Sequence, residues 1–234
     1  MVIRDWSSDV CSSDLPTQDV LDELDAFLAG RPPLDSITFS GSGEPTLHLG
    51  IGKIINYIKD HYPEYPVTVL TNGTLLTVPA VRAELLPADR VIPSLDAVSD
   101  AAFDVVNRPA PGLDNTTIIE GLVSFREEYR GQLWLEFFLV PGLNDTPDEL
   151  AAVAAAAARI RPDRVQLNSL DRPPAYAGIV APTPGRLLEV ATALDTVLVP
   201  ALGFGVEIVA RQFVAVPVYA VSPNAARTVV DTLR

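Results

Sequence analysis

The chain has 234 residues, of which 48% are hydrophobic, and its formal net charge is -13. A chain of this length buries most of the surface that its unfolded form exposes, so we expect one domain with one sizeable core. The acidic balance argues against an exposed basic groove for nucleic acid and against attraction to an anionic membrane surface, although a local basic site remains compatible with it. One cysteine, no apolar leader and no long apolar run predict a cytoplasmic protein without disulfides or a membrane span.

Helical and strand patterns alternate along the chain. Helices are predicted at Thr17–Ala29, Ile51–Ile58, about 99–106, about 114–129, 146–159 and from Thr183 onward. Strands are predicted at Ser36–Phe39, Val67–Leu70, Arg90–Leu95, Leu133–Val140, Asp163–Asn168 and Val206–Ala210. Thr17 is a candidate N-cap, and the segment Thr146 to Glu149 has the pattern of a capping box. The alternation predicts a parallel sheet, either doubly wound or closed into a barrel.

Polar residues follow strand after strand, which favours a barrel or partial barrel with its site at the carboxyl ends of the strands. The first of these segments is Ser40-Gly-Ser-Gly-Glu44-Pro45. Its glycines allow a close backbone approach to a ligand, but it lacks the Lys-Ser/Thr of a P-loop and the third glycine of a dinucleotide fingerprint. A carboxylate beside such glycines suits a cationic amine, and the alternative is a tight turn with a solvated glutamate.

Six segments in fixed order carry a resemblance to a known family: "ITFSGSGEPTLH", "VLTNGTLL", "VIPSLDA", "NRP", "LWLEFFLVPGLND" and "PDRVQLNSLDRPP". From about Pro16 to Ala210 the chain resembles radical S-adenosylmethionine (SAM) enzymes, especially the branch related to wyosine-type tRNA base modification. The resemblance implies an α/β fold, a partial (β/α)6 TIM-like barrel of the radical SAM type. It also implies S-adenosyl-L-methionine and a [4Fe-4S] cluster as cofactors, and an electron donor such as flavodoxin or ferredoxin.

The resemblance also implies a set of cofactor-binding residues. Gly43, Glu44 and the backbone around Ser42, with the adjoining Pro45, match the segment that holds the amino group of SAM. Ser94 and Asp96 match polar positions that contact the ribose. The remaining candidates are Asn72, at the neighbouring strand end, and Asn144 and Asn168, near the adenine or the substrate.

Each candidate also has a purely structural interpretation. Asn72-Gly73 is a common turn pair, Ser94 and Asp96 could cap the segments that follow them, and Asn144 could shape the turn before Thr146. Outside the set, Glu136 lies in an apolar strand and should point into the barrel mouth or be neutralised, because a buried carboxylate is costly.

Two arginines and two histidines give weaker signals outside the cofactor set. Arg108 and Arg172 could bind a substrate anion, but a lone arginine is more often part of a surface ion pair. His48 and His61 are expected in a loop and on the surface, and we predict no histidine metal site.

The first residues depart from the family pattern. Family members hold their cluster on three cysteines spaced C-x3-C-x2-C after the first strand, because soft thiolates hold iron-sulfur clusters. This chain has "DWSSDVCSSDL" there, with Cys11 alone. Residues 5–15 resemble a sequencing-library adapter translated in one frame, and the alternative is a genuine Ser/Asp-rich disordered terminus. We therefore expect residues 1–15 to be an adapter-like artefact without a fold, 16–210 to be the barrel lacking its first strand and cluster loop, and 211–234 to begin a truncated helical domain.

These expectations divide the functional prediction in two. The parent protein is expected to cleave SAM reductively to a 5′-deoxyadenosyl radical, whereas the chain as written should bind no cluster and be inactive. Its substrate is not readable from the sequence; the branch resemblance points to a tRNA base. A non-catalytic scaffold that binds SAM or another nucleoside is the main alternative. A hydrolase or aldolase barrel is less well supported, since no lysine ends a strand and no H-E-x-x-H occurs.

Overall fold

A computed structural model of the protein describes residues 16–41, 43–170 and 178–209. Within this part of the chain, six parallel strands lie side by side in chain order, β1-β2-β3-β4-β5-β6. The strands are β1 (Ile37–Phe39), β2 (Val67–Thr71), β3 (Arg90–Pro93), β4 (Gln132–Leu139), β5 (Arg164–Ser169) and β6 (Glu207–Ile208). Parallel strands in chain order with helical crossovers form a partial barrel, so the predicted fold class is confirmed.

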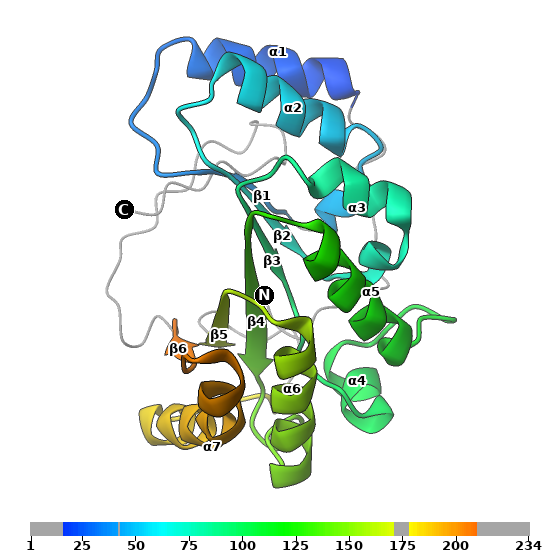
Figure 1. Cartoon of the computed structure of the whole chain (residues 1–234), viewed down its shortest axis with the longest axis vertical. Helices are drawn as coiled ribbons and strands as arrows, with labels where there is room; N and C mark the ends of the chain where they lie inside the picture. Colours follow the sequence, from blue (N-terminus) through cyan, green and yellow to red (C-terminus); the bar gives the residue numbers. More distant parts are fainter. Residues whose placement is uncertain (1–15, 42, 171–177, 210–234) are drawn as a thin grey trace.

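Helices connect the strands and lie around one side of the sheet (Figure 1). They are α1 (Thr17–Leu28), α2 (Ile51–His61), α3 (Pro79–Leu85), α4 (Asp100–Val106), α5 (Asn115–Glu128), α6 (Pro147–Ile160) and α7 (Pro184–Leu202), with short 3-10 helices η2 (Pro45–Leu47) and η3 (Thr74–Thr77). Sequence patterns did not predict α3, η2 or η3. In α3 only Arg82 and Leu85 are buried, so seven residues carry too few apolar positions to show a helical period.

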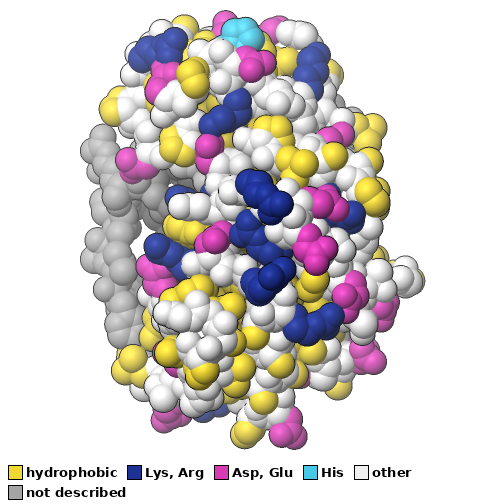
Figure 2. All heavy atoms as spheres, in the orientation of Figure 1, with side chains coloured by type: hydrophobic (Ala, Val, Ile, Leu, Met, Phe, Trp, Pro, Cys, Tyr) yellow, Lys and Arg dark blue, Asp and Glu magenta, His cyan; other side chains and the backbone are white. Residues whose placement is uncertain are grey.

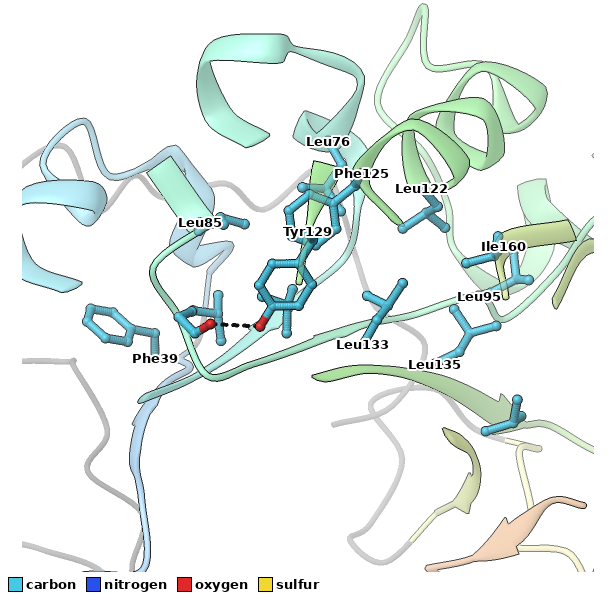
Figure 3. Close-up of a cluster of buried hydrophobic side chains, with 14 of the residues drawn as sticks. Phe39, Leu76, Leu85, Leu95, Leu122, Phe125, Tyr129, Leu133, Leu135 and Ile160 are labelled. Carbon is cyan, nitrogen blue, oxygen red and sulfur yellow. Dashed lines mark hydrogen bonds between the residues drawn. The ribbon is translucent and has the colours of Figure 1, made fainter. Parts of the chain in front are cut away.

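The core lies between the sheet and these helices. In β4, the buried Leu133, Leu135, Phe137 and Leu139 alternate with half-buried residues that face the inner side of the partial barrel. Figure 3 shows α5 side chains packing over the strands, and the Tyr129 hydroxyl donates to the Ala88 carbonyl oxygen at 2.9 Å. Deep burial raises the pKa of Tyr129, as expected for a phenol that stays neutral in the core.

Two predicted caps differ from the structure. Thr17 is the first helical residue of α1 and not its N-cap, which is Pro16. At α6, Thr146 Oγ1 accepts from the Glu149 amide at 3.3 Å, which is one half of the predicted capping box. The Glu149 carboxylate does not complete the box, because it accepts instead from the amides of Val98 and Ser99.

The ladder between β3 and β4 is interrupted at Pro93. Ser94 N donates to Thr71 of β2, and Leu95 N donates to Glu136 of β4, so successive amides face opposite neighbours. By this alternation the Pro93 nitrogen faces β4, and it has no hydrogen to donate. Pairing resumes at an isolated bridge between Ser94 and Glu136. This break places Ser94 beside Glu136 at the carboxyl edge of the sheet.

Several predictions fall outside the described residues: the adapter-like segment 5–15 with Cys11, the first strand and cluster loop before Pro16, and the C-terminal extension 211–234. In the described part, β1 forms one edge of the sheet. No helix in the described ranges is long and apolar enough to cross a membrane.

Candidate functional site

Glu44 ties the glycine-containing loop after β1 to the end of β2. Its Oε1 accepts from Thr46 N at 3.0 Å, Thr46 Oγ1 at 2.6 Å and Thr71 Oγ1 at 2.6 Å, and its Oε2 accepts from Asn72 N at 2.6 Å. The residue is 7% exposed. A carboxylate offers about four acceptor sites, so these protein donors use most of its capacity. The expected bare carboxylate for an amine is therefore, in this structure, a fixed anchor that positions the loop.

The rest of this loop is set by its neighbours. Pro45 opens η2 and Glu44 caps it, which holds Gly43 immediately before the cap at the carboxyl end of β1. Ser42 lies outside the described residues. Gly43 thus directly precedes Glu44, whose carboxylate accepts from the Asn72 amide.

Asn72 forms the turn that its sequence suggested. Its Oδ1 accepts from Thr74 N at 2.9 Å and from Thr74 Oγ1 at 2.7 Å, and Gly73 has the left-handed backbone that this turn requires, with φ 79°. The Asn72 side chain is half-buried. The Asn72 oxygen therefore holds the turn, and its amide nitrogen donates to no residue in the described part of the chain.

Three polar side chains from neighbouring strands meet on the inner face. Ser94 pairs with Glu136 across the isolated bridge, and Phe138 pairs with Asn168 in the ladder between β4 and β5. Asn168 Nδ2 donates to Glu136 Oε2 at 3.4 Å, and its Oδ1 accepts from Ser169 N at 2.8 Å. We call Ser94, Glu136 and Asn168 the inner-face group. Glu136 belongs to the inner, half-buried side of β4, the side that faces the barrel mouth.

Asp96 and Asn144 lie behind this face and are almost completely buried, at 3% and 0% exposure. Asp96 Oδ1 accepts from Phe138 N at 3.0 Å, and Oδ2 accepts from Asn107 Nδ2 at 3.1 Å. Asn144 Nδ2 donates to the carbonyls of Asp96 and Phe138, both at 2.8 Å, while its Oδ1 accepts from Val140 N at 2.8 Å. These bonds match the structural interpretation of Asn144, and they leave both side chains few sites for a cofactor.

Sequence reasoning missed three residues that complete this buried network. Asn115 Nδ2 donates to the carbonyls of Ala97 and Val98, and Glu149 binds the amides that follow them. Asn107, in the "NRP" segment, holds Asp96, and its Oδ1 has no hydrogen-bond partner in the described structure. We call Asp96, Asn107, Asn115, Asn144 and Glu149 the buried clasp. Polar residues after strand ends signalled Asp96 and Asn144, whereas Asn107, Asn115 and Glu149 lie at helix ends, where nothing in the sequence indicated a shared network.

The remaining candidates lie elsewhere. Arg108 is exposed, with a left-handed φ of 51°, and Arg172 is outside the described residues. His48 Nδ1 accepts from Gly50 N at 3.0 Å, and His61 stacks on Tyr57 with ring centroids 4.1 Å apart, as expected for a loop and a surface histidine. Among the described residues no group of three His, Cys, Asp or Glu could hold a metal ion.

Comparisons with known proteins identify the family. Residues 7–154 match the family model described as "Radical SAM superfamily". The chain is 36% identical over 144 residues to a UPF0026 protein of Helicobacter pylori strain J99, covering 62% of this chain and 46% of that protein. It is 40% identical over 154 residues to a protein of Brachyspira hyodysenteriae named GTPase Obg, covering 66% of this chain and 22% of that protein. The chain thus spans less than half the length of these relatives.

A solved structure agrees with the fold. The structure "Native anSMEcpe with bound AdoMet" superposes with a TM-score of 0.60 at 18% sequence identity, covering 86% of this chain and 57% of that one. The family model matches well over half of the chain, and the sheet order is that of a partial barrel. The chain belongs to the radical SAM superfamily.

Proposed function

We propose that this chain is the SAM-binding portion of a cytoplasmic radical SAM enzyme, with SAM held at the carboxyl edge of the sheet. The observation that carries the proposal is the meeting, at one edge, of the Gly43 loop, Asn72 and the inner-face group. Ligands bind at this edge in open parallel sheets and barrels, because the connecting loops converge there. The AdoMet bound to anSMEcpe, a protein of similar fold, supports the choice of ligand.

Each residue has a distinct proposed task. The loop backbone around Gly43, fixed by Glu44, offers carbonyl groups to the SAM ammonium. Asn72 Nδ2 donates to the SAM carboxylate or ribose, and the Ser94 hydroxyl and Asn168 bind ribose or adenine from the opposite strands. The buried clasp contacts no ligand in this proposal. Asp96 and Asn144 act as positioning residues that hold the loop after β3, so that Ser94 keeps its place beside Glu136.

The residues of this chain do not fit an iron-sulfur cluster. Such a cluster needs three thiolates here, and the whole sequence has one cysteine. In a parent enzyme that supplies C-x3-C-x2-C ahead of Pro16, the cluster and SAM would provide reductive cleavage to a 5′-deoxyadenosyl radical. We propose that the chain as written binds SAM without cleaving it. A tRNA base as substrate, and flavodoxin or ferredoxin as electron donor, belong to the proposal for the parent enzyme.

A non-catalytic SAM- or nucleoside-binding scaffold is the second candidate, favoured by the single cysteine. The name GTPase, borne by one relative, does not extend to the site described above. Lys53 follows Gly52, but Ile54 stands where a P-loop needs Ser or Thr, and the loop that ends at Glu44 contains no lysine.

The proposal is tested by SAM titration calorimetry on the purified chain, followed by anaerobic reconstitution with iron and sulfide. We expect SAM binding, no cluster absorbance and no 5′-deoxyadenosine. A second protein, with a C-x3-C-x2-C segment grafted ahead of Pro16, should gain cluster absorbance and SAM cleavage. Absence of SAM binding would refute the proposed site, and cleavage by the ungrafted chain would refute the proposed inactivity. A graft that carries the cluster and binds SAM but never cleaves it would favour the scaffold.

A further inference from the structure

A second polar layer occupies the inner face at the amino-terminal ends of the strands, away from the proposed SAM site. The Arg90 guanidinium lies over the Trp134 ring at 3.8 Å from its centroid, and the Arg164 guanidinium lies over the same ring at 4.4 Å. Ladder pairing of Arg164 with Trp134 puts both on the inner side of the sheet. Ser94 lies four positions after Arg90, a rise of about 13 Å along a strand. This layer and the carboxyl edge are thus separate places on one face.

The two arginines differ in how their charge is balanced. Arg164 Nη1 forms an ion pair with Glu207 Oε2 at 2.7 Å. Arg90 donates only through Nε, to Gln132 Oε1 at 3.3 Å, and its two terminal nitrogens bind no described residue. Its neighbour Asp89 is engaged by Lys59 at 2.8 Å and by Val67 N at 2.7 Å. Among the described residues, Glu207 therefore balances the charge of Arg164, and Asp89, which also attracts Arg90, is balanced by Lys59, so one positive charge remains in this layer.

The surroundings of Arg90 favour an anion. Burial first, and then repulsion from Arg164, lowers the pKa of Arg90, so its charge is held at a cost that a bound anion would offset. Stacking on Trp134 fixes the planar guanidinium, which reduces the entropy lost when it binds a ligand. Thr68, the ladder partner of Arg90, shares a hydroxyl contact of 2.8 Å with Ser36, so further O–H donors adjoin the same position.

We propose that Arg90 and Arg164, ordered by Trp134, form a binding site for a phosphate group of a small molecule at the amino-terminal end of the inner face. Guanidinium forks match tetrahedral phosphate oxygens through paired hydrogen bonds. The site uses residues from β3, β4 and β5 that the proposed SAM site does not use. It therefore stands whether or not the chain binds SAM.

Nonspecific attraction of anions is the competing explanation. Figure 2 shows Lys and Arg side chains gathered near the middle of one face, although the net charge of the chain is -13. Arg130 and Arg161 are exposed directly ahead of the amino-terminal ends of β4 and β5. Arg130→Gln therefore removes the same charge as Arg90→Gln without touching the Trp134 stack, and it is the matched control.

The test is a titration with inorganic phosphate at constant ionic strength, followed by the fluorescence of Trp134 in a Trp6→Phe background, which leaves Trp134 as the single tryptophan. We expect a saturable change, at least a tenfold weaker affinity in Arg90→Gln, and an affinity within twofold of the parent in Arg130→Gln. Arg164→Gln should also weaken binding, and it serves as the second variant if Arg90→Gln unfolds.

Three results would overturn the proposal. The first is the absence of a saturable response, and the second is equal weakening by Arg130→Gln, which would show nonspecific attraction. The third is equal saturation by acetate, which would show that the layer does not select phosphate. Phosphate binding that survives loss of SAM binding in a Ser94→Ala variant would confirm that the two sites are independent.

Discussion

Two groups of polar residues lie at the same edge of the sheet, and they differ in how many hydrogen bonds they form with the backbone, although Ser94 of the inner-face group is as buried as the clasp. The side chains of the buried clasp form most of their hydrogen bonds with the backbone. Asn144, which is fully buried, donates to the carbonyls of Asp96 and Phe138 and accepts from the amide of Val140. The side chains of the inner-face group form few hydrogen bonds with the backbone in the described part of the chain. Asn168 Nδ2 donates to Glu136 Oε2 at a long distance, 3.4 Å. The first group holds the loops in place, and we propose that the Ser94 and Asn168 side chains of the second contact SAM.

The largest expected effect comes from breaking the clasp. Asn144→Ala leaves the carbonyls of Asp96 and Phe138 and the amide of Val140 unpaired in a buried place. Each orphaned group costs about 1–3 kcal/mol, so we expect the free energy of unfolding to fall by roughly 3 kcal/mol. Urea denaturation of the variant and the parent measures this difference in the free energy of unfolding. Asn56→Ala, on the exposed side of α2, should cost less than about 0.5 kcal/mol, and a similar loss in both variants would contradict the distinction.

Glu44→Gln should have an intermediate effect on both stability and binding. The Glu44 carboxylate accepts from two backbone amides, those of Thr46 and Asn72, on different oxygens. A glutamine has one oxygen, so its NH2 group must face one of these amides. We expect a loss of about 2 kcal/mol in unfolding free energy and weaker SAM binding, because the loop loses its anchor. A variant as stable as the parent would show that the Glu44 bonds are not formed in solution.

A third polar cluster, in which Tyr57 and Tyr62 meet the exposed Asp25 of α1, should show the smallest effect. Hydrogen bonds from Tyr62 first, and Tyr57 second, lower the pKa of Asp25. A lowered folded pKa means that this stabilisation is present above the unfolded value of 3.8 and is lost as pH falls through the folded value. Tyr62→Phe should therefore lower the urea midpoint at pH 6, with a deficit that shrinks below pH 3.8. A deficit that does not change with pH would point to lost packing.

The same pair predicts the alkaline behaviour. The hydrogen bond to Asp25 raises the pKa of Tyr62 to about 12. Because the folded pKa is raised above the unfolded value of 10.0, this contribution is complete below pH 10 and is lost as pH rises through about 12. Ultraviolet titration of tyrosinate should show several late-titrating phenols, Tyr129 among them, and the one that titrates near pH 12 should be missing in Tyr62→Phe. A normal titration of all tyrosines would contradict the contact.

The sheet was predictable because its signals are local. Alternating helical and strand patterns located all six described strands, and the residues Ser99 and Asp114 that begin predicted helices do cap α4 and α5. The division between clasp and inner face was not predictable, because it depends on which way each side chain points. Ser94 and Asp96 are two residues apart and share a motif, yet Asp96 follows the end of β3 and turns into the buried network.

The sequence likewise did not predict which groups the charged side chains contact. Glu149 fits a capping box by spacing, but the amides of Val98 and Ser99 come within its reach only after the sheet brings β3 and β4 together. The Arg90–Trp134–Arg164 stack likewise joins three strands that are far apart in the chain. Long-range register, and not local propensity, decides such contacts.

The most direct test of the central claim is SAM titration calorimetry on Ser94→Ala and Asn168→Ala beside the parent chain and Asn56→Ala. If the inner-face group binds SAM, the two inner-face variants should keep the parent's unfolding free energy within about 1 kcal/mol and lose about tenfold in affinity, as expected for one lost hydrogen bond each. Asn56→Ala should bind as the parent does. Unchanged affinity in both inner-face variants would contradict the claim that SAM lies on this face.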